Sequence, residues 1–179
     1  MEPGRAYKRI GERRYREVRG LYYEEFEIGA IVEHRPGRTI TETDNIWQSL
    51  LALNPHPLHI DHAYGERTEF GRTLVSSLVT LSLVSGMSVN GTSAKTLANL
   101  GWDHIRLHHP VFVGDTIYAE SEFLSKRLSQ SRPHQGVVTV ATEGFNQDAV
   151  VVCTFQRTLM VYKRGMAPDR APPIPTPKP

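Results

Sequence analysis

Apolar and polar residues alternate along the second half of the chain, as they do in strands that bury one face. Three such runs, rich in β-branched residues, cover residues 115–124, 136–145 and 149–162, and an earlier run covers residues 98–113. Short turns separate the last three runs. Strands that are joined in this way predict an antiparallel meander.

Residues 41–54 show the spacing of an amphipathic helix. Thr41 or Thr43 offers an N-cap, and the helix must end at Asn54, because a residue before proline is pushed away from helical geometry. The predicted apolar stripe follows the i, i+3/i+4, i+7 rule and consists of Ile46, Trp47, Leu50, Leu51 and Leu53.

Residues 73–89 are apolar around most of a helical circumference, which predicts a buried helix. Between residues 28 and 40, glycine and proline interrupt short apolar pieces, which favours brief strands or a hairpin. One buried helix followed by an antiparallel sheet long enough to wrap it predicts an α+β fold. An exposed sheet edge of this kind favours dimerisation.

The length of 179 residues is enough for one domain with a full core. We expect a basic, mobile arm over residues 1–20, a single domain over 21–164 and a proline-rich, disordered tail over 165–179. The arm holds seven Lys/Arg against three Glu, while the whole chain has a net charge of +2. Aromatic residues are sparse in the arm and no nucleic-acid motif follows, so we expect no nucleic-acid partner.

Serines repeatedly interrupt the longest apolar-rich segment, so no membrane span is predicted. The chain also lacks a charged-then-apolar leader, and a cytoplasmic protein is the expectation. Cys153 is the only cysteine and stands in an apolar run, which excludes an internal disulfide and predicts a buried thiol.

Three histidines, an amide and a carboxylate gather within residues 54–62 (NPHPLHIDH), on a turn that two prolines make stiff. Imidazole is suited to proton transfer near neutral pH. Histidines at three-residue spacing, together with Asp61, also suggest zinc. The prolines argue against the helical geometry that would place His56, His59 and His62 on one face, so we expect no metal.

Residues 57–61 (PLHID), the apolar helix after them and residues 110–116 (PVFVGDT) resemble the MaoC-like, or R-specific, enoyl-CoA hydratases of the hot-dog fold. The resemblance spans residues 22–164 approximately. Further stretches resemble one branch, the hydratases of itaconyl-CoA or mesaconyl-CoA: residues 37–45 (GRTITETDN), 99–103 (NLGWD), 131–133 (SRP) and 146–148 (NQD).

The resemblance implies a homodimer with each active site in a tunnel between subunits, and a reversible syn addition of water to an enoyl-CoA. It implies no cofactor, since CoA is part of the substrate, and the branch implies a branched dicarboxylic acyl group. His59 matches the histidine of the family, whereas Asn54 stands in place of its aspartate. An amide can orient water but cannot accept its proton.

Two interpretations follow from that departure. His59 acts as the sole proton-transfer group while Asn54 positions the water, or another acid or base enters the site. The candidates each have a simpler structural explanation as a helix-start, capping or loop residue; they are Asp44, Asp61, Glu42 and His56.

The resemblance also implies that a backbone N–H at the start of the buried helix polarises the thioester carbonyl. Ser76 and Ser77 stand where the family has histidine and glycine, so the N–H of Ser77 is the candidate. A second carboxylate on the substrate would call for a guanidinium, with Arg72, Arg38 and Arg106 as candidates. Basic residues of a later loop would contact the phosphates of CoA, namely Lys126, Arg127 and Arg132. Each of these basic candidates could equally be an ordinary solvated side chain on the surface.

Two other functions compete with hydration. A hot-dog thioesterase would carry a carboxylate on the buried helix, and residues 74–87 contain none. A non-catalytic acyl-CoA-binding or interaction subunit stays open because Asn54 and Ser77 depart from the family pattern.

Overall fold

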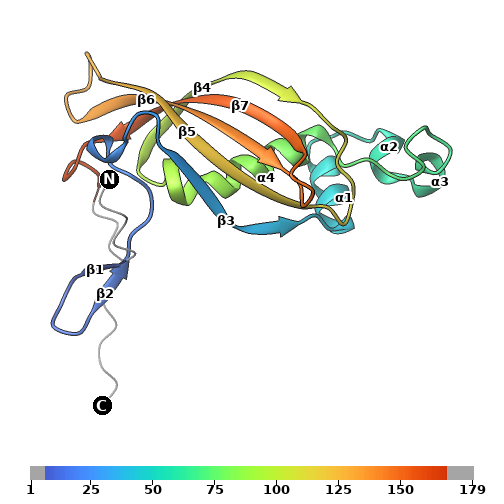
Figure 1. The fold of residues 1–179 in the computed structure, drawn as a ribbon, viewed down its shortest axis with the longest axis horizontal. Helices are drawn as coiled ribbons and strands as arrows, with labels where there is room; N and C mark the ends of the chain where they lie inside the picture. The colour runs from blue at the N-terminus through green and yellow to red at the C-terminus, as the bar shows by residue number, and fades with distance from the viewer. Residues whose placement is uncertain (1–6, 169–179) are drawn as a thin grey trace.

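A curved antiparallel sheet and a long helix packed against it form the two layers of the molecule (Figure 1). The computed structural model describes residues 7–168. The strand order is β3-β5-β6-β7-β4, so the strand that follows the helix forms an edge of the sheet. The strands are β3 (Ile31–Thr39), β4 (Thr96–Leu107), β5 (Thr116–Leu128), β6 (Gln135–Phe145) and β7 (Val151–Tyr162). The predicted α+β class and meander are confirmed.

The central helix α4 covers Ser77–Ser88 and continues as a π-helical turn, η2 (Val89–Ser93). It begins later than the predicted residue 73, because Val75 N–H donates to the Val111 carbonyl at 2.8 Å and so holds this segment extended. Across the part of the chain that the structure describes, no helix is both long and apolar enough to cross a membrane.

Three shorter helices lie at one end of the sheet: α1 (Glu42–Leu51), α2 (Pro57–Ile60) and α3 (His62–Gly65) (Figure 1). Of the two predicted N-caps for α1, Thr41 is the correct one. Its hydroxyl accepts the N–H of Asp44 at 3.2 Å, and the Asp44 carboxylate accepts the N–H of Thr41 at 2.8 Å. The Thr41 hydroxyl also donates to this carboxylate at 2.6 Å, and this hydrogen bond together with that from the Thr41 N–H lowers the pKa of Asp44.

Residues 28–40 do not form a hairpin, contrary to one of the two predictions for them. They form one strand, β3, at the edge of the sheet opposite β4. The register of β3 against β5 shifts between His34 and Arg38. Pro36 lies within this irregularity, and an edge strand tolerates proline because one side of its backbone needs no partner. The sequence also did not predict the hairpin of β1 (Tyr7–Arg9) and β2 (Tyr15–Glu17). The boundaries proposed at residues 20 and 164 stay predictions, and most of the expected proline-rich tail, residues 169–179, lies outside the described residues.

The core consists of two clusters of buried apolar side chains. One cluster lies under α4 and includes Val79, Val84 and Phe155, and the other contains no residue of α4 and includes Phe123 and Leu159. Cys153 is part of the first cluster and is fully buried, as predicted, and burial raises the pKa of its thiol to about 11.

A belt of buried polar side chains crosses the inner face of the sheet between these clusters. His34 Nε2 lies 2.8 Å from Ser121 Oγ, which in turn lies 2.8 Å from Thr142 Oγ1. Farther along, Arg157 donates to Ser88 Oγ at 2.6 Å, and burial lowers the pKa of this arginine to about 10. The six residues of this polar belt are His34, Ser88, Thr92, Ser121, Thr142 and Arg157, none more than 4% exposed.

Because His34 is buried in the polar belt, we expect the stability of the fold to decrease at acid pH. Burial and the charge of Arg157 lower the pKa of His34 from 6.5 to about 4. Below pH 6.5 the unfolded chain therefore takes up a proton that the folded chain does not, and stability falls as the pH is lowered from 6.5 toward 4. We expect the free energy of unfolding in urea to drop between pH 7.0 and 4.5 by about 2 kcal/mol more in the wild type than in His34→Gln. Equal drops would contradict the assignment to His34.

Candidate active site

Asn45 joins the three segments that meet at the predicted cluster. Its side chain is 1% exposed, and its Nδ2 donates to the carbonyls of His59 at 2.9 Å and Leu74 at 3.3 Å. Its Oδ1 accepts the N–H of Ser76 at 2.9 Å. One amide thereby fixes α1, α2 and the start of α4 relative to one another.

The imidazole of His59 is held in one tautomer. His59 is the third residue of α2, and its Nδ1 lies 2.9 Å from the carbonyl oxygen of Leu74. A carbonyl can only accept, so Nδ1 carries the proton of the neutral ring, and Nε2 presents a lone pair. This is the form that a general base requires.

The neighbouring His56 is held in the opposite tautomer. It is the N-cap of α2, where its Nδ1 accepts the N–H of Leu58 at 3.2 Å. The neutral ring must then carry its proton on Nε2, which becomes a hydrogen-bond donor. The ring centroids of His56 and His59 are 5.9 Å apart. The two imidazoles thus offer a donor and an acceptor side by side.

The cluster is more helical than the sequence suggested. Pro57 was expected to keep residues 54–62 extended, yet it is the first residue of α2, where the fixed φ of proline favours a helix and its missing N–H costs nothing. Asn54 lies in the preceding turn, and its Oδ1 accepts the N–H of His56 at 3.3 Å. In residues 7–168 no group of three or more histidine, cysteine or acidic side chains comes together as a metal site requires.

Each acidic candidate has a structural partner. Asp44 closes the capping box of α1 and forms an ion pair with Arg38 at 2.8 Å. Asp61 caps α3 by accepting the N–H of Tyr64 at 3.0 Å. Glu42 shares a hydrogen bond with His62, which links α1 to α3.

The start of α4 presents an unused donor beside this cluster. The Ser76 N–H is bonded to Asn45, while within residues 7–168 the N–H of Ser77 has no acceptor. Ser77 is exposed and is the first residue of a twelve-residue helix, whose positive end favours negative charge. Its N–H has the chemistry that an enolate oxygen would need.

The predicted arginines are divided between the two ends of the molecule. Arg72 lies two residues before Leu74, and its guanidinium stacks 3.7 Å from the centroid of the Phe112 ring. Within the described chain this guanidinium has no hydrogen-bond acceptor. Arg127 lies at the end of β5, and Arg132 follows that strand. The end of β5 is on the order of 35 Å from the start of the same strand. Arg72 lies close in sequence to the Leu74 carbonyl that holds His59, and Arg38 reaches α1 through its ion pair with Asp44.

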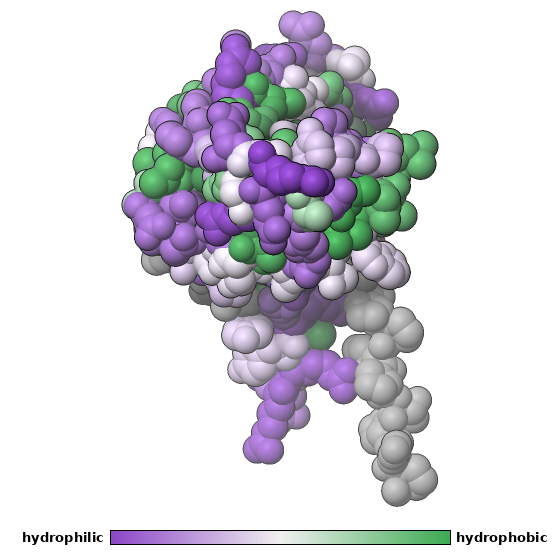
Figure 2. Space-filling model, turned by 90° about the vertical axis from the view of Figure 1, so that its right-hand side faces the viewer, coloured by the Kyte–Doolittle hydropathy of each residue, from purple (hydrophilic) through white to green (hydrophobic). Residues whose placement is uncertain are grey.

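The apolar face predicted for α1 faces outward and not toward the core. Trp47 is 68% exposed and Leu51 is 78% exposed, whereas Asn45 and Ser49 are buried. The hydrogen bonds of Asn45 decide which face packs against the fold, so the apolar stripe remains on the surface. Figure 2 looks onto this end of the molecule, where green apolar side chains gather beside the polar ones of the tip.

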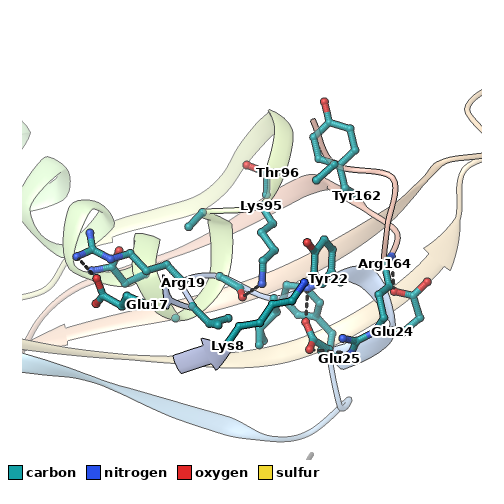
Figure 3. A pocket seen from close by; sticks show the side chains of 18 of the residues that line it. Lys8, Glu17, Arg19, Tyr22, Glu24, Glu25, Lys95, Thr96, Tyr162 and Arg164 are labelled. Carbon is teal, nitrogen blue, oxygen red and sulfur yellow. Dashed lines mark hydrogen bonds and ion pairs between the residues drawn. The ribbon is translucent and has the colours of Figure 1, made fainter. Parts of the chain in front are cut away.

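A separate cleft of about 1890 Å³ lies between the β1/β2 hairpin and the segment that follows it (Figure 3). There Lys95 Nζ donates to the Gly20 carbonyl at 2.6 Å, and Arg164 forms an ion pair with Glu25 at 2.8 Å. Burial lowers the pKa of Lys95. None of the predicted catalytic residues lines this cleft.

Asn45 is the site residue that sequence reasoning missed. A lone amide among the apolar positions of a predicted helix was the available signal. We expect Asn45→Ala to lower the free energy of unfolding by about 2–4 kcal/mol, because the variant leaves the buried Ser76 N–H and the His59 carbonyl without the amide that pairs with them. Urea unfolding measures this, with exposed Thr43→Ala on the same helix as the control. An unchanged stability would show that the amide does not hold the site together.

A sheet wrapped around one helix in this strand order is the hot-dog fold. A protein of Mycobacterium tuberculosis that has a double hot-dog fold matches with a TM-score of 0.75 and 22% identity, over 86% of this chain and 47% of that one. The family model described as mesaconyl-CoA hydratase matches residues 2–171, and the chain belongs to this family. The resemblance to MaoC-like proteins, and to this branch of them, is confirmed.

Two curated relatives agree with the family assignment. The chain is 32% identical to a mesaconyl-CoA hydratase of Cereibacter sphaeroides, over 87% of this chain and 46% of the relative. It is 31% identical to a β-methylmalyl-CoA dehydratase of Chloroflexus aurantiacus, over 80% of this chain and 45% of the relative. The chain thus spans about half the length of these relatives.

Proposed function

We propose that this chain reversibly hydrates an enoyl-CoA thioester with a branched dicarboxylic acyl group, of the mesaconyl-CoA type. Family membership and the two relatives support the substrate class. The observation that carries the chemistry is the hydrogen bond from His59 Nδ1 to the Leu74 carbonyl, since it leaves Nε2 free to take a proton.

The proton transfers need only His59. Its Nε2 takes one proton from water while the water oxygen bonds to the β-carbon of the substrate. The electron pair of the double bond moves through the α-carbon toward the thioester oxygen. The imidazolium then returns the same proton to the α-carbon, so one water is added and His59 ends as it began. Asn54 orients the water, and the engaged carboxylates of Asp44 and Asp61 take no part.

The enolate oxygen would lie against the N–H of Ser77. This donor is fixed before the substrate arrives, and the dipole of α4 adds to its effect. Arg72 would meet an anionic group of the substrate with the free edge of its stacked guanidinium. Arg127 and Arg132 lie at the end of β5 and just after it. They would contact CoA phosphates only if that end of a sheet, in the same or a second subunit, borders the site.

We further propose that the working form is a homodimer, or a larger assembly of it, with no cofactor. Strand β4 has one free edge and carries Leu100 and Trp102, which are 51% and 37% exposed. Together with the exposed face of α1, this edge offers apolar surface for a second hot-dog unit. A tunnel between two units would enclose the His59 site.

A substrate panel tests the function. Purified protein is mixed with mesaconyl-CoA, itaconyl-CoA and crotonyl-CoA, and the loss of enoyl-thioester absorbance is followed together with the release of free CoA. We expect hydration of at least one dicarboxylic thioester. Release of CoA would instead indicate a thioesterase, and binding without turnover would indicate a binding subunit.

A further inference from the structure

The proposed substrate places a negative charge next to the reacting carbon. In a malyl group the hydroxyl lies on the carbon that also bears the free carboxylate, and a relative of this chain is named for dehydrating β-methylmalyl-CoA. The carbon that receives water therefore carries the carboxylate, whose oxygens lie roughly 2.4 Å from it. Some donor of the site must face that charge, or the charge would be desolvated without compensation.

Distance restricts the choice of donor. The attacking water lies about 3 Å from the base and about 3–3.5 Å from the carbon, so the carboxylate lies within roughly 9 Å of His59 Nε2. Arg157 is buried with an unpartnered Nε, but it reaches Ser88, which is about 16 Å along α4 from Ser77. The buried cation of the core is therefore too distant.

His56 meets the requirement. Its ring centroid is 5.9 Å from that of His59, and the N–H of Leu58 holds its proton on Nε2. We propose that the Nε2–H of His56 donates a hydrogen bond to the free carboxylate of the acyl group and so selects dicarboxylic substrates. This inference rests on the proposed function and gives His56 a positioning role beside the base.

The test replaces His56 by asparagine, which keeps an N-cap oxygen for the Leu58 N–H but removes the imidazole donor. We expect kcat/KM for mesaconyl-CoA to fall about 10- to 100-fold, the loss of one charge-assisted hydrogen bond, and kcat/KM for crotonyl-CoA to stay within about threefold. His62→Asn is the matched control, since His62 is exposed and pairs with Glu42 outside the site. It should leave the ratio of the two substrates unchanged.

Two results would overturn the inference. One is an equal loss on both thioesters, which would make His56 part of the common machinery. The other is a collapse of selectivity in Arg72→Gln while His56→Asn keeps it, which would assign the carboxylate to Arg72.

Dissociation constants of both thioesters, measured by calorimetry on the same variants, separate this inference from the function. If the wild type hydrates neither thioester, the proposed function fails. Selective weakening of mesaconyl-CoA binding in His56→Asn would then still support the role of His56, and an absence of such weakening would reject it.

Discussion

Replacing His59 by alanine is expected to lower kcat/KM for hydration by about 10²- to 10⁴-fold, the usual contribution of a positioned acid–base group. The same side chain removes the proton from water and returns it to the α-carbon, while the carboxylates of Asp44 and Asp61 are engaged in helix caps. The loss should appear in kcat, because the imidazole acts on the reacting atoms. Steady-state kinetics with mesaconyl-CoA measures it.

The fold should survive this change. The carbonyls of His59 and Leu74 keep their hydrogen bonds to Asn45, because these bonds involve only the backbone of residue 59. Thermal unfolding and the oligomeric state are compared with those of the wild type, and His62→Ala is the matched histidine variant. A rate within a few-fold of the wild type in His59→Ala would reject the mechanism.

Replacing Ser77 by proline should lower kcat by about 10²- to 10³-fold, the typical effect of losing one oxyanion donor. Proline removes the N–H of residue 77 but suits the first position of a helix. The preceding Ser76 has φ −59° and ψ 139°, which is the extended geometry that proline requires before it. The variant therefore deletes the donor without disturbing α4.

Ser77→Ala is the matched control for the proline variant. It removes the hydroxyl and keeps the N–H, so its kcat should stay near that of the wild type. Urea unfolding should give similar stabilities for the two variants. If alanine and proline reduce kcat equally, the backbone donor is not what stabilises the enolate.

The sequence predicted the elements better than their orientation. The strands β5, β6 and β7 follow from alternation of β-branched residues, because this pattern has a period of two that few other structures share. The face of α1 could not be predicted in the same way. Its apolar residues are exposed and its buried face is polar, since the contacts of Asn45 with the backbone of residues 59, 74 and 76 turn that face inward.

The sequence proposed candidate residues for the site but could not predict their geometry. His59 was recognisable because it matches the histidine of the family that residues 57–61 and 110–116 resemble. Its tautomer, however, depends on Leu74, fifteen residues away, and that of His56 depends on the turn that Pro57 begins. For Asp44 and Asp61 the sequence offered both an acid–base role and a helix-start or capping role, and their hydrogen bonds to Thr41 and Tyr64 are those of caps.

The polar belt also fixes where α4 can lie along the sheet. Gly91 of η2 packs so closely on His34 that a Cβ at this position would come within 2.8 Å of the imidazole. A slip of the helix by one residue would place Asn90 or Thr92 against the ring and separate Arg157 from Ser88. The belt therefore fixes the position of the helix along the sheet. The contact that fixes it, at Gly91, lies fourteen residues from Ser77, whose N–H position beside His59 depends on it.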